Sequence, residues 1–72
     1  MLIKKVSKMG SSMRIVYLPS SKFVWGQRVK LKPKGKNYYI IKKVSKMGVH
    51  RLVVIPKGDW EIFKHGSEVY VT

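Results

Sequence analysis

Apolar and polar residues alternate along several short stretches of the chain, which is the period expected of half-buried β-strands. The clearest case is the segment 28–32, where Val29 and Leu31 alternate with three cationic residues. The last residues, 68–72, alternate in the same way. The segments 2–9, 14–18, 38–47 and 51–55 are rich in the β-branched, aliphatic and aromatic residues that strands favour. The pattern therefore predicts a mainly β protein.

Turn-forming residues separate these segments. Gly-Ser-Ser at 10–12 and Pro-Lys-Gly-Lys-Asn at 33–37 read as turns, and Pro19 stops the strand before it. Asp59 is a good helix N-cap and Gly66 a good helix end, so we expect a helix over residues 59–65. The matching stretch 20–25 is shorter, and we expect at most one helical turn there. The aromatic residues of these two stretches are expected to pack in the core: Phe23, Trp25, Trp60 and Phe63.

The chain contains an internal duplication. The octapeptide IKKVSKMG begins at Ile3 and again at Ile41. An apolar strand that ends in proline follows in both copies, as RIVYLP in the first and RLVVIP in the second. Residues 1–38 and 39–72 are therefore two versions of one unit, each too small to bury its own apolar face. We expect one domain, residues 1–72, in which the two repeats interleave.

Two interleaved repeats would be related by a pseudo-twofold axis and could close one small barrel, which removes exposed strand edges. The residues that face inward under this arrangement match in pairs between the copies. The predicted core consists of Val6, Val16, Leu18, Val29, Leu31, Val44, Val53, Ile55, Val69 and Val71.

The amino-acid composition limits the kinds of catalytic and metal site that the chain can form. The chain has 72 residues, 16 Lys and Arg against three acids, and a formal net charge of +13. Without cysteine, a disulfide framework, a thiolate zinc site and a Cys nucleophile are excluded. Paired-carboxylate catalysis would need two of the three acids, Asp59, Glu61 and Glu68, to converge in the fold. The histidines His50 and His65 lack the spacing of a metal site. We expect no enzyme, no cofactor, no metal and no small-molecule substrate.

A field of this sign favours a polyanionic partner, with nucleic acid ahead of an anionic membrane surface. The charge is uneven: residues 1–38 hold ten cations and no acids, whereas residues 39–72 hold six cations and three acids. No apolar run approaches the ~18 residues of a membrane span, and the N-terminal sequence lacks the apolar stretch of a signal peptide. The expected location is the cytoplasm, in association with the nucleoid.

The repeated motifs resemble the AbrB/MazE/SpoVT swapped-hairpin family, whose pattern is roughly K-V-S-x-x-G, an apolar strand ending in Ile-Pro, a helix, and G-D-x-V. The second copy carries KVSKMG at 43–48, VIP at 54–56 and GSEV at 66–69. The first carries KVSKMG at 5–10, YLP at 17–19 and GQRV at 26–29, and departs through a longer turn, a shorter helix and Gln-Arg in place of an acid.

The resemblance implies a small swapped-hairpin barrel that binds double-stranded DNA as a transcriptional regulator. Family members pair two chains, so two copies in one chain imply a fused, monomeric pseudo-dimer in which residues 1–3 stand in for a strand after Thr72. An antitoxin role is disfavoured, because such members carry a C-terminal extension.

The candidate contacts with DNA are basic and polar residues of the first strands and following hairpins: Lys4, Lys5, Lys8, Ser12, Arg14, Lys42, Lys43, Lys46, His50 and Arg51. Lysine and arginine neutralise phosphates and release counterions. Arg14 and Arg51 are the best candidates for guanine, because the guanidinium fork fits O6 and N7.

Two questions stay open at this stage. A second cationic series, Lys30 to Lys36, either extends the DNA track or protects an edge strand. Tyr38, Tyr39 and Tyr70 either stack single-stranded bases or pack on half-buried strands. The sequence therefore predicts a duplex-DNA-binding regulator or small architectural protein, with an RNA-binding small barrel as the alternative.

Overall fold

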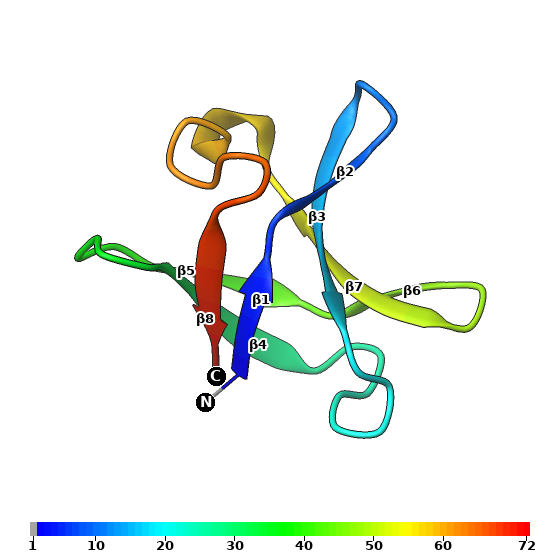
Figure 1. Ribbon diagram of the computed structural model, residues 1–72. Helices are drawn as coiled ribbons and strands as arrows, with labels where there is room; N and C mark the ends of the chain where they lie inside the picture. Colours follow the sequence, from blue (N-terminus) through cyan, green and yellow to red (C-terminus); the bar gives the residue numbers. More distant parts are fainter. Residues whose placement is uncertain (1) are drawn as a thin grey trace.

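The computed structural model describes residues 2–72 and contains two four-stranded antiparallel sheets (Figure 1). The prediction of a mainly β protein is confirmed. The strands over this range are β1 (Leu2–Lys5), β2 (Ser7–Met9), β3 (Met13–Leu18), β4 (Arg28–Pro33), β5 (Ile40–Lys43), β6 (Ser45–Met47), β7 (His50–Ile55) and β8 (Glu68–Val71).

The strand order is β1-β8-β4-β5 in one sheet, called sheet A here, and β2-β3-β7-β6 in the other, sheet B. The predicted closed barrel is wrong. β1 and β2 form one run of chain that pairs with β8 before Val6 and with β3 after it. β5 and β6 change partners from β4 to β7 at Val44 in the same manner. At Val6 and Val44 the chain stops pairing within one sheet and begins pairing within the other. Each sheet therefore stays open instead of closing on itself.

Local hydrogen bonds fix both points where the chain changes sheet. The Val6 N–H donates to the Ser67 carbonyl, and the Val6 carbonyl accepts from the Gly66 N–H, both at 2.9 Å. Gly66 has a φ of +84°, which glycine adopts without the steric cost that a Cβ brings. At Val44, the N–H donates to the Gln27 carbonyl and the carbonyl accepts from the N–H of a glycine at position 26.

The core lies between the two sheets. All ten predicted core residues are buried, none more than 6% exposed, and they belong to one cluster that draws on both copies. Phe23 and Phe63 join this cluster, as predicted. Trp25 does not: its side chain is 70% exposed, so the expectation of a core role is wrong. Trp60 is half-buried against the cluster edge.

The predicted helix over residues 59–65 is also wrong. Only a single 3₁₀ turn, η1 (Lys57–Asp59), forms before the chain continues in turns. The Phe63 N–H still donates to the Asp59 carbonyl at 2.9 Å, so one helical bond is made. Beyond Phe63 the hydrogen bonds form isolated turns, and the Gly66 N–H bonds to Val6 instead of to a carbonyl of its own segment. The stretch 20–25 forms turns and no helix.

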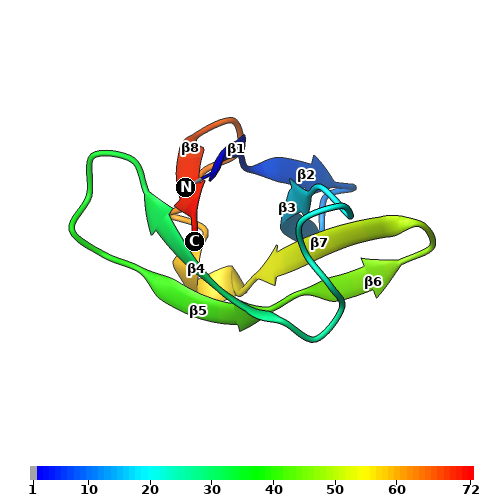
Figure 2. The same cartoon turned by 90° about the horizontal axis from the view of Figure 1, so that it is seen from below.

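Strand order excludes the edge-strand interpretation of the Lys30–Lys36 series. β4 lies inside sheet A between β8 and β5, so these lysines do not protect an edge strand. The hairpins β2–β3 and β6–β7 lie on one side of the molecule, and the turn that joins β4 to β5 lies on the other (Figures 1 and 2).

Candidate nucleic-acid interface

Each of the two sheet B hairpins carries a pair of opposed cations. Lys8 of β2 is directly opposite Arg14 of β3, and Lys46 of β6 is opposite Arg51 of β7. Directly opposed residues of antiparallel strands project from the same face. The two predicted hairpin contacts of each copy are therefore brought together, and the lysine is exposed in both cases.

The arginines are more enclosed than the lysines. The Arg14 guanidinium carbon lies 4.5 Å from the centre of the Trp60 ring, a cation–π arrangement. Trp60 is held by its Nε1–H, which donates to the Ile55 carbonyl at 3.0 Å. Arg14 Nη1 and Arg51 Nε are both buried without a hydrogen-bond partner in the protein. Each arginine is thus half-buried beside an exposed lysine, with one nitrogen enclosed and unpaired.

The lysine pairs at the start of each copy divide between two faces of sheet A. Lys5 is exposed and opposite Glu68 in β8, whose carboxylate pairs with Lys34 at 3.3 Å. Lys43 is exposed and opposite Arg28, which adds to its charge. Lys4 and Lys42 are half-buried and opposite core valines, and Lys42 also lines a cleft together with Arg28 and Lys43.

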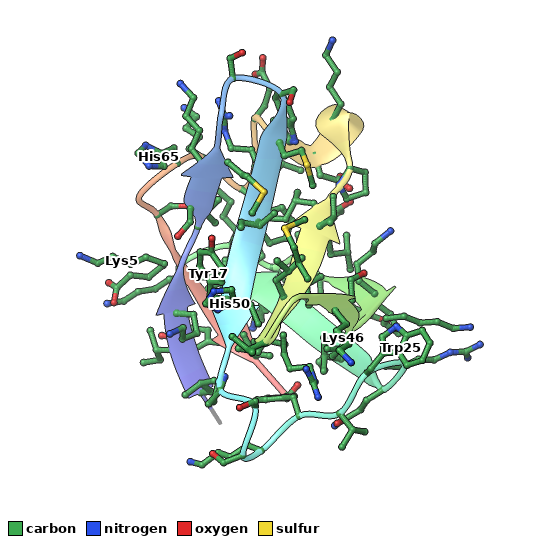
Figure 3. All side chains as sticks on the ribbon, turned by 90° about the vertical axis from the view of Figure 1, so that its right-hand side faces the viewer. Lys5, Tyr17, Trp25, Lys46, His50 and His65 are labelled. Atoms are coloured by element: carbon green, nitrogen blue, oxygen red, sulfur yellow. The ribbon has the colours of Figure 1, made fainter. Side chains whose placement is uncertain are left out.

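The polar turn residues also separate. Ser12 is exposed in the turn between β2 and β3. His50 lies on the opposite face of β7 from Arg51, because neighbouring strand residues alternate. Its ring packs edge-on against Tyr17, with 5.6 Å between ring centres (Figure 3). The structure therefore does not bring His50 together with the hairpin cations.

Sequence reasoning missed two contributors. Trp60 was expected in the core, yet it supports Arg14, and the spacing of the two residues along the chain gave no signal of that contact. Arg28 lies outside the repeated octapeptide and became relevant only through its pairing with Lys43. A signal did exist for Arg28: it aligns with Glu68 of the second copy, and this reversal of charge makes the two ends of sheet A electrostatically different.

One side-chain hydrogen bond ties the start of β5 to η1. The Tyr38 hydroxyl donates to the Asp59 carboxylate at 2.9 Å. This hydrogen bond, with smaller effects of burial and of the Asp59 charge, raises the pKa of Tyr38 above its usual 10.0. The raised folded-state pKa means that the contact contributes below pH ~10 and is lost as pH rises through the Tyr38 pKa.

We expect an Asp59→Asn substitution to lower the pKa of Tyr38, because the phenolate no longer faces a carboxylate. Alkaline titration of tyrosine absorbance would measure this shift, with Tyr38→Phe identifying which part of the signal belongs to Tyr38. A titration curve that Asp59→Asn leaves unmoved would contradict the assigned cause.

Over residues 2–72 there is no group of three or more His, Cys, Asp or Glu residues placed to hold a metal ion. No helix in that range is long and apolar enough to cross a membrane. No protein-family model, curated protein or solved structure matches the chain.

Proposed function

We propose that this protein binds double-stranded DNA through its two sheet B hairpins, as a transcriptional regulator or a small architectural protein. The observation that carries the proposal is the repeated pair of cations, Lys8 with Arg14 and Lys46 with Arg51, at matching positions of the two hairpins. Two equivalent basic arms suit a duplex, whose phosphates recur along two strands.

The fold proposed with this function is an AbrB-like swapped-hairpin arrangement in which the two repeats act as a pseudo-dimer. Strand pairing supports it. The equivalent residues Val16 and Val53 are directly opposite in the β3–β7 pair, and Leu31 is opposite its equivalent Val71 in the β4–β8 pair. Exchanging the copies therefore leaves both central registers unchanged, which is the relation expected of a pseudo-twofold axis.

The environment of each cation suggests which cations contact phosphates and which contact bases. Lys8 and Lys46 are exposed and flexible, which suits contacts with phosphate. Arg14 is half-buried and lies against Trp60, and a guanidinium is the group suited to a bidentate contact with a base or phosphate. Lysines then supply affinity for any duplex, and the arginines supply preference among sequences.

The test is the double variant Lys8→Gln with Lys46→Gln, measured against duplex DNA over a range of salt concentrations. Each lost phosphate contact should flatten the dependence of log K on log salt by about 0.9, so the slope should fall by about 1.8. If affinities converge near 1 M salt, binding at about 0.1 M weakens by roughly 60-fold.

The matched control is Lys22→Gln with Lys64→Gln, which removes the same charge from exposed lysines outside the hairpins. This variant should bind duplex DNA nearly as the unmodified protein does. Equal losses in the two double variants would show that net charge alone drives binding, and would remove the hairpins as the site.

A further inference from the structure

The outer face of sheet A carries exposed apolar and aromatic side chains. In β4, Val29 and Leu31 face the core, so the alternate residues face outward. Ile41, opposite Lys30, is 58% exposed, and Tyr39 just before β5 is 55% exposed. An isoleucine at position 3, opposite Tyr70 at the other edge, is 49% exposed. These values show that no other part of residues 2–72 covers the face.

Cations lie directly among these side chains. Lys32 is opposite Tyr70 in the β4–β8 pair. Lys30 Nζ lies 5.0 Å from the centre of the Tyr39 ring. The one acidic residue on these strands, Glu68, is engaged by Lys34 at 3.3 Å, which reduces its effect on the face. Aromatic rings and uncompensated positive charge therefore alternate across β8, β4 and β5.

Two clefts border this arrangement. One, of about 410 Å³, is lined by Lys30, Lys32, Tyr70 and Thr72. The other, of about 560 Å³, lies where β5 passes into β6 and is lined by Arg28, Ile41, Lys42, Lys43, Ser45 and Val54. Together the linings hold five cations and no acid. Ile41 and Lys30 are opposite each other in β4–β5, so the two clefts flank a common pair of strands.

We propose that the outer face of sheet A binds a single strand of nucleic acid, with bases stacked on Tyr39 and Tyr70 and phosphates held by the lysines and Arg28. Proteins that bind single strands with little sequence preference combine a positively charged groove along the backbone with aromatic side chains on which successive bases stack. The outer face of sheet A has the same combination of cations and aromatic rings. The occupied length would be on the order of four nucleotides, the lower end for a small β domain.

A single strand fits this face better than a duplex does. Stacking requires base faces, which a duplex hides between neighbouring pairs. The exposed Tyr39 ring, the half-buried Tyr70 ring and the isoleucines would meet only sugar and phosphate on a duplex, and would gain little from burial. The proposal is independent of the hairpin site, because it uses residues of sheet A and none of the four hairpin cations.

The experiment measures anisotropy of labelled oligothymidylate and oligouridylate of about 12 nucleotides. Tyr39→Ala should weaken binding of both by roughly 5- to 150-fold, the range for loss of one stacked base. Tyr39→Phe should bind like the unmodified protein, because the ring is kept. Comparable affinity for the two oligonucleotides would show that stacking dominates, and a clear preference for one would identify RNA or DNA as the ligand.

Tyr17→Ala is the matched control, since Tyr17 is an exposed tyrosine on a strand of sheet B. It should leave single-strand binding unchanged. Lys8→Gln with Lys46→Gln should weaken duplex binding and spare oligothymidylate, whereas Tyr39→Ala should do the reverse. Failure of the hairpin site and failure of this site are therefore separate results.

Three outcomes would overturn the proposal. One is single-strand affinity that Tyr39→Ala leaves unchanged while far-UV circular dichroism shows a folded protein. Another is an equal loss in Tyr17→Ala. The third is binding to phosphatidylserine-containing vesicles that Tyr39→Ala abolishes without affecting oligonucleotides, which would assign the face to an anionic membrane surface.

Discussion

Replacing Phe63 with alanine should lower the free energy of unfolding by about 3–5 kcal/mol, the usual cost of removing a buried phenyl ring. Phe63 is fully buried and packs in the one core cluster. A domain of 72 residues has a total stability of roughly 4–11 kcal/mol at typical values per residue. The loss is therefore a large fraction of the whole, and we expect the unfolding temperature to fall by more than 12 °C.

The control is Trp25→Ala, which removes a larger aromatic side chain from the corresponding segment of the first copy. Because Trp25 is 70% exposed, its removal should change stability by less than about 0.5 kcal/mol. Urea unfolding followed by circular dichroism would compare the two variants. A Trp25→Ala protein destabilised as much as Phe63→Ala would show that the segment 20–25 packs differently from the structure described here.

The strands could be predicted from the sequence because their signals are local. Val29 and Leu31 alternate with lysines, and Pro19 and Pro56 follow the last residues of β3 and β7. Burial followed from the same alternation, which is why the ten core residues were identified correctly.

The errors concern features that depend on distant partners. The sequence of the run from Leu2 to Met9 does not record that its hydrogen bonds pass from β8 to β3 at Val6, and that change of partner is what leaves the sheets open. The helix expected at 59–65 has sound local signals, but the segment forms isolated turns, and the Gly66 N–H at its end bonds to Val6, sixty positions earlier in the chain. Trp25 was misplaced because its segment forms turns in which Phe23, two residues earlier, takes the core position.

The candidate site was predictable only where its sequence signals are local. The repeated octapeptide drew attention to Lys8 and Lys46, and the turn that follows each one sets its partner. The turn between Lys8 and Arg14 is one residue longer than the turn between Lys46 and Arg51. Both hairpins nevertheless place the lysine directly opposite the arginine. The face of sheet A could not be assembled from sequence, because Lys30 and Lys32 come beside Tyr70 only through the pairing of β4 with β8.

Duplex DNA affinity should fall by roughly 150-fold between about 50 and 200 mM salt if the four hairpin cations each neutralise one phosphate. Four contacts at about 0.9 each give a slope of log K against log salt near −3.6. Lys4 and Lys42 are left out of this sum because they are half-buried, and Lys5 because it lies in sheet A, outside the two hairpins.

Single-stranded oligonucleotides offer an internal comparison in the same titration. A single strand has a smaller charge density than a duplex, so each phosphate contact contributes about 0.7 to the slope instead of about 0.9. Three or four contacts with the exposed cations of sheet A then predict a shallower slope of about −2 to −3. Stacking on Tyr39 does not depend on counterion release, so affinity for single strands should persist at salt concentrations where duplex binding is lost. Equal slopes for the two nucleic acids, both insensitive to Lys8→Gln with Lys46→Gln, would mean that one cationic surface away from the hairpins serves both ligands.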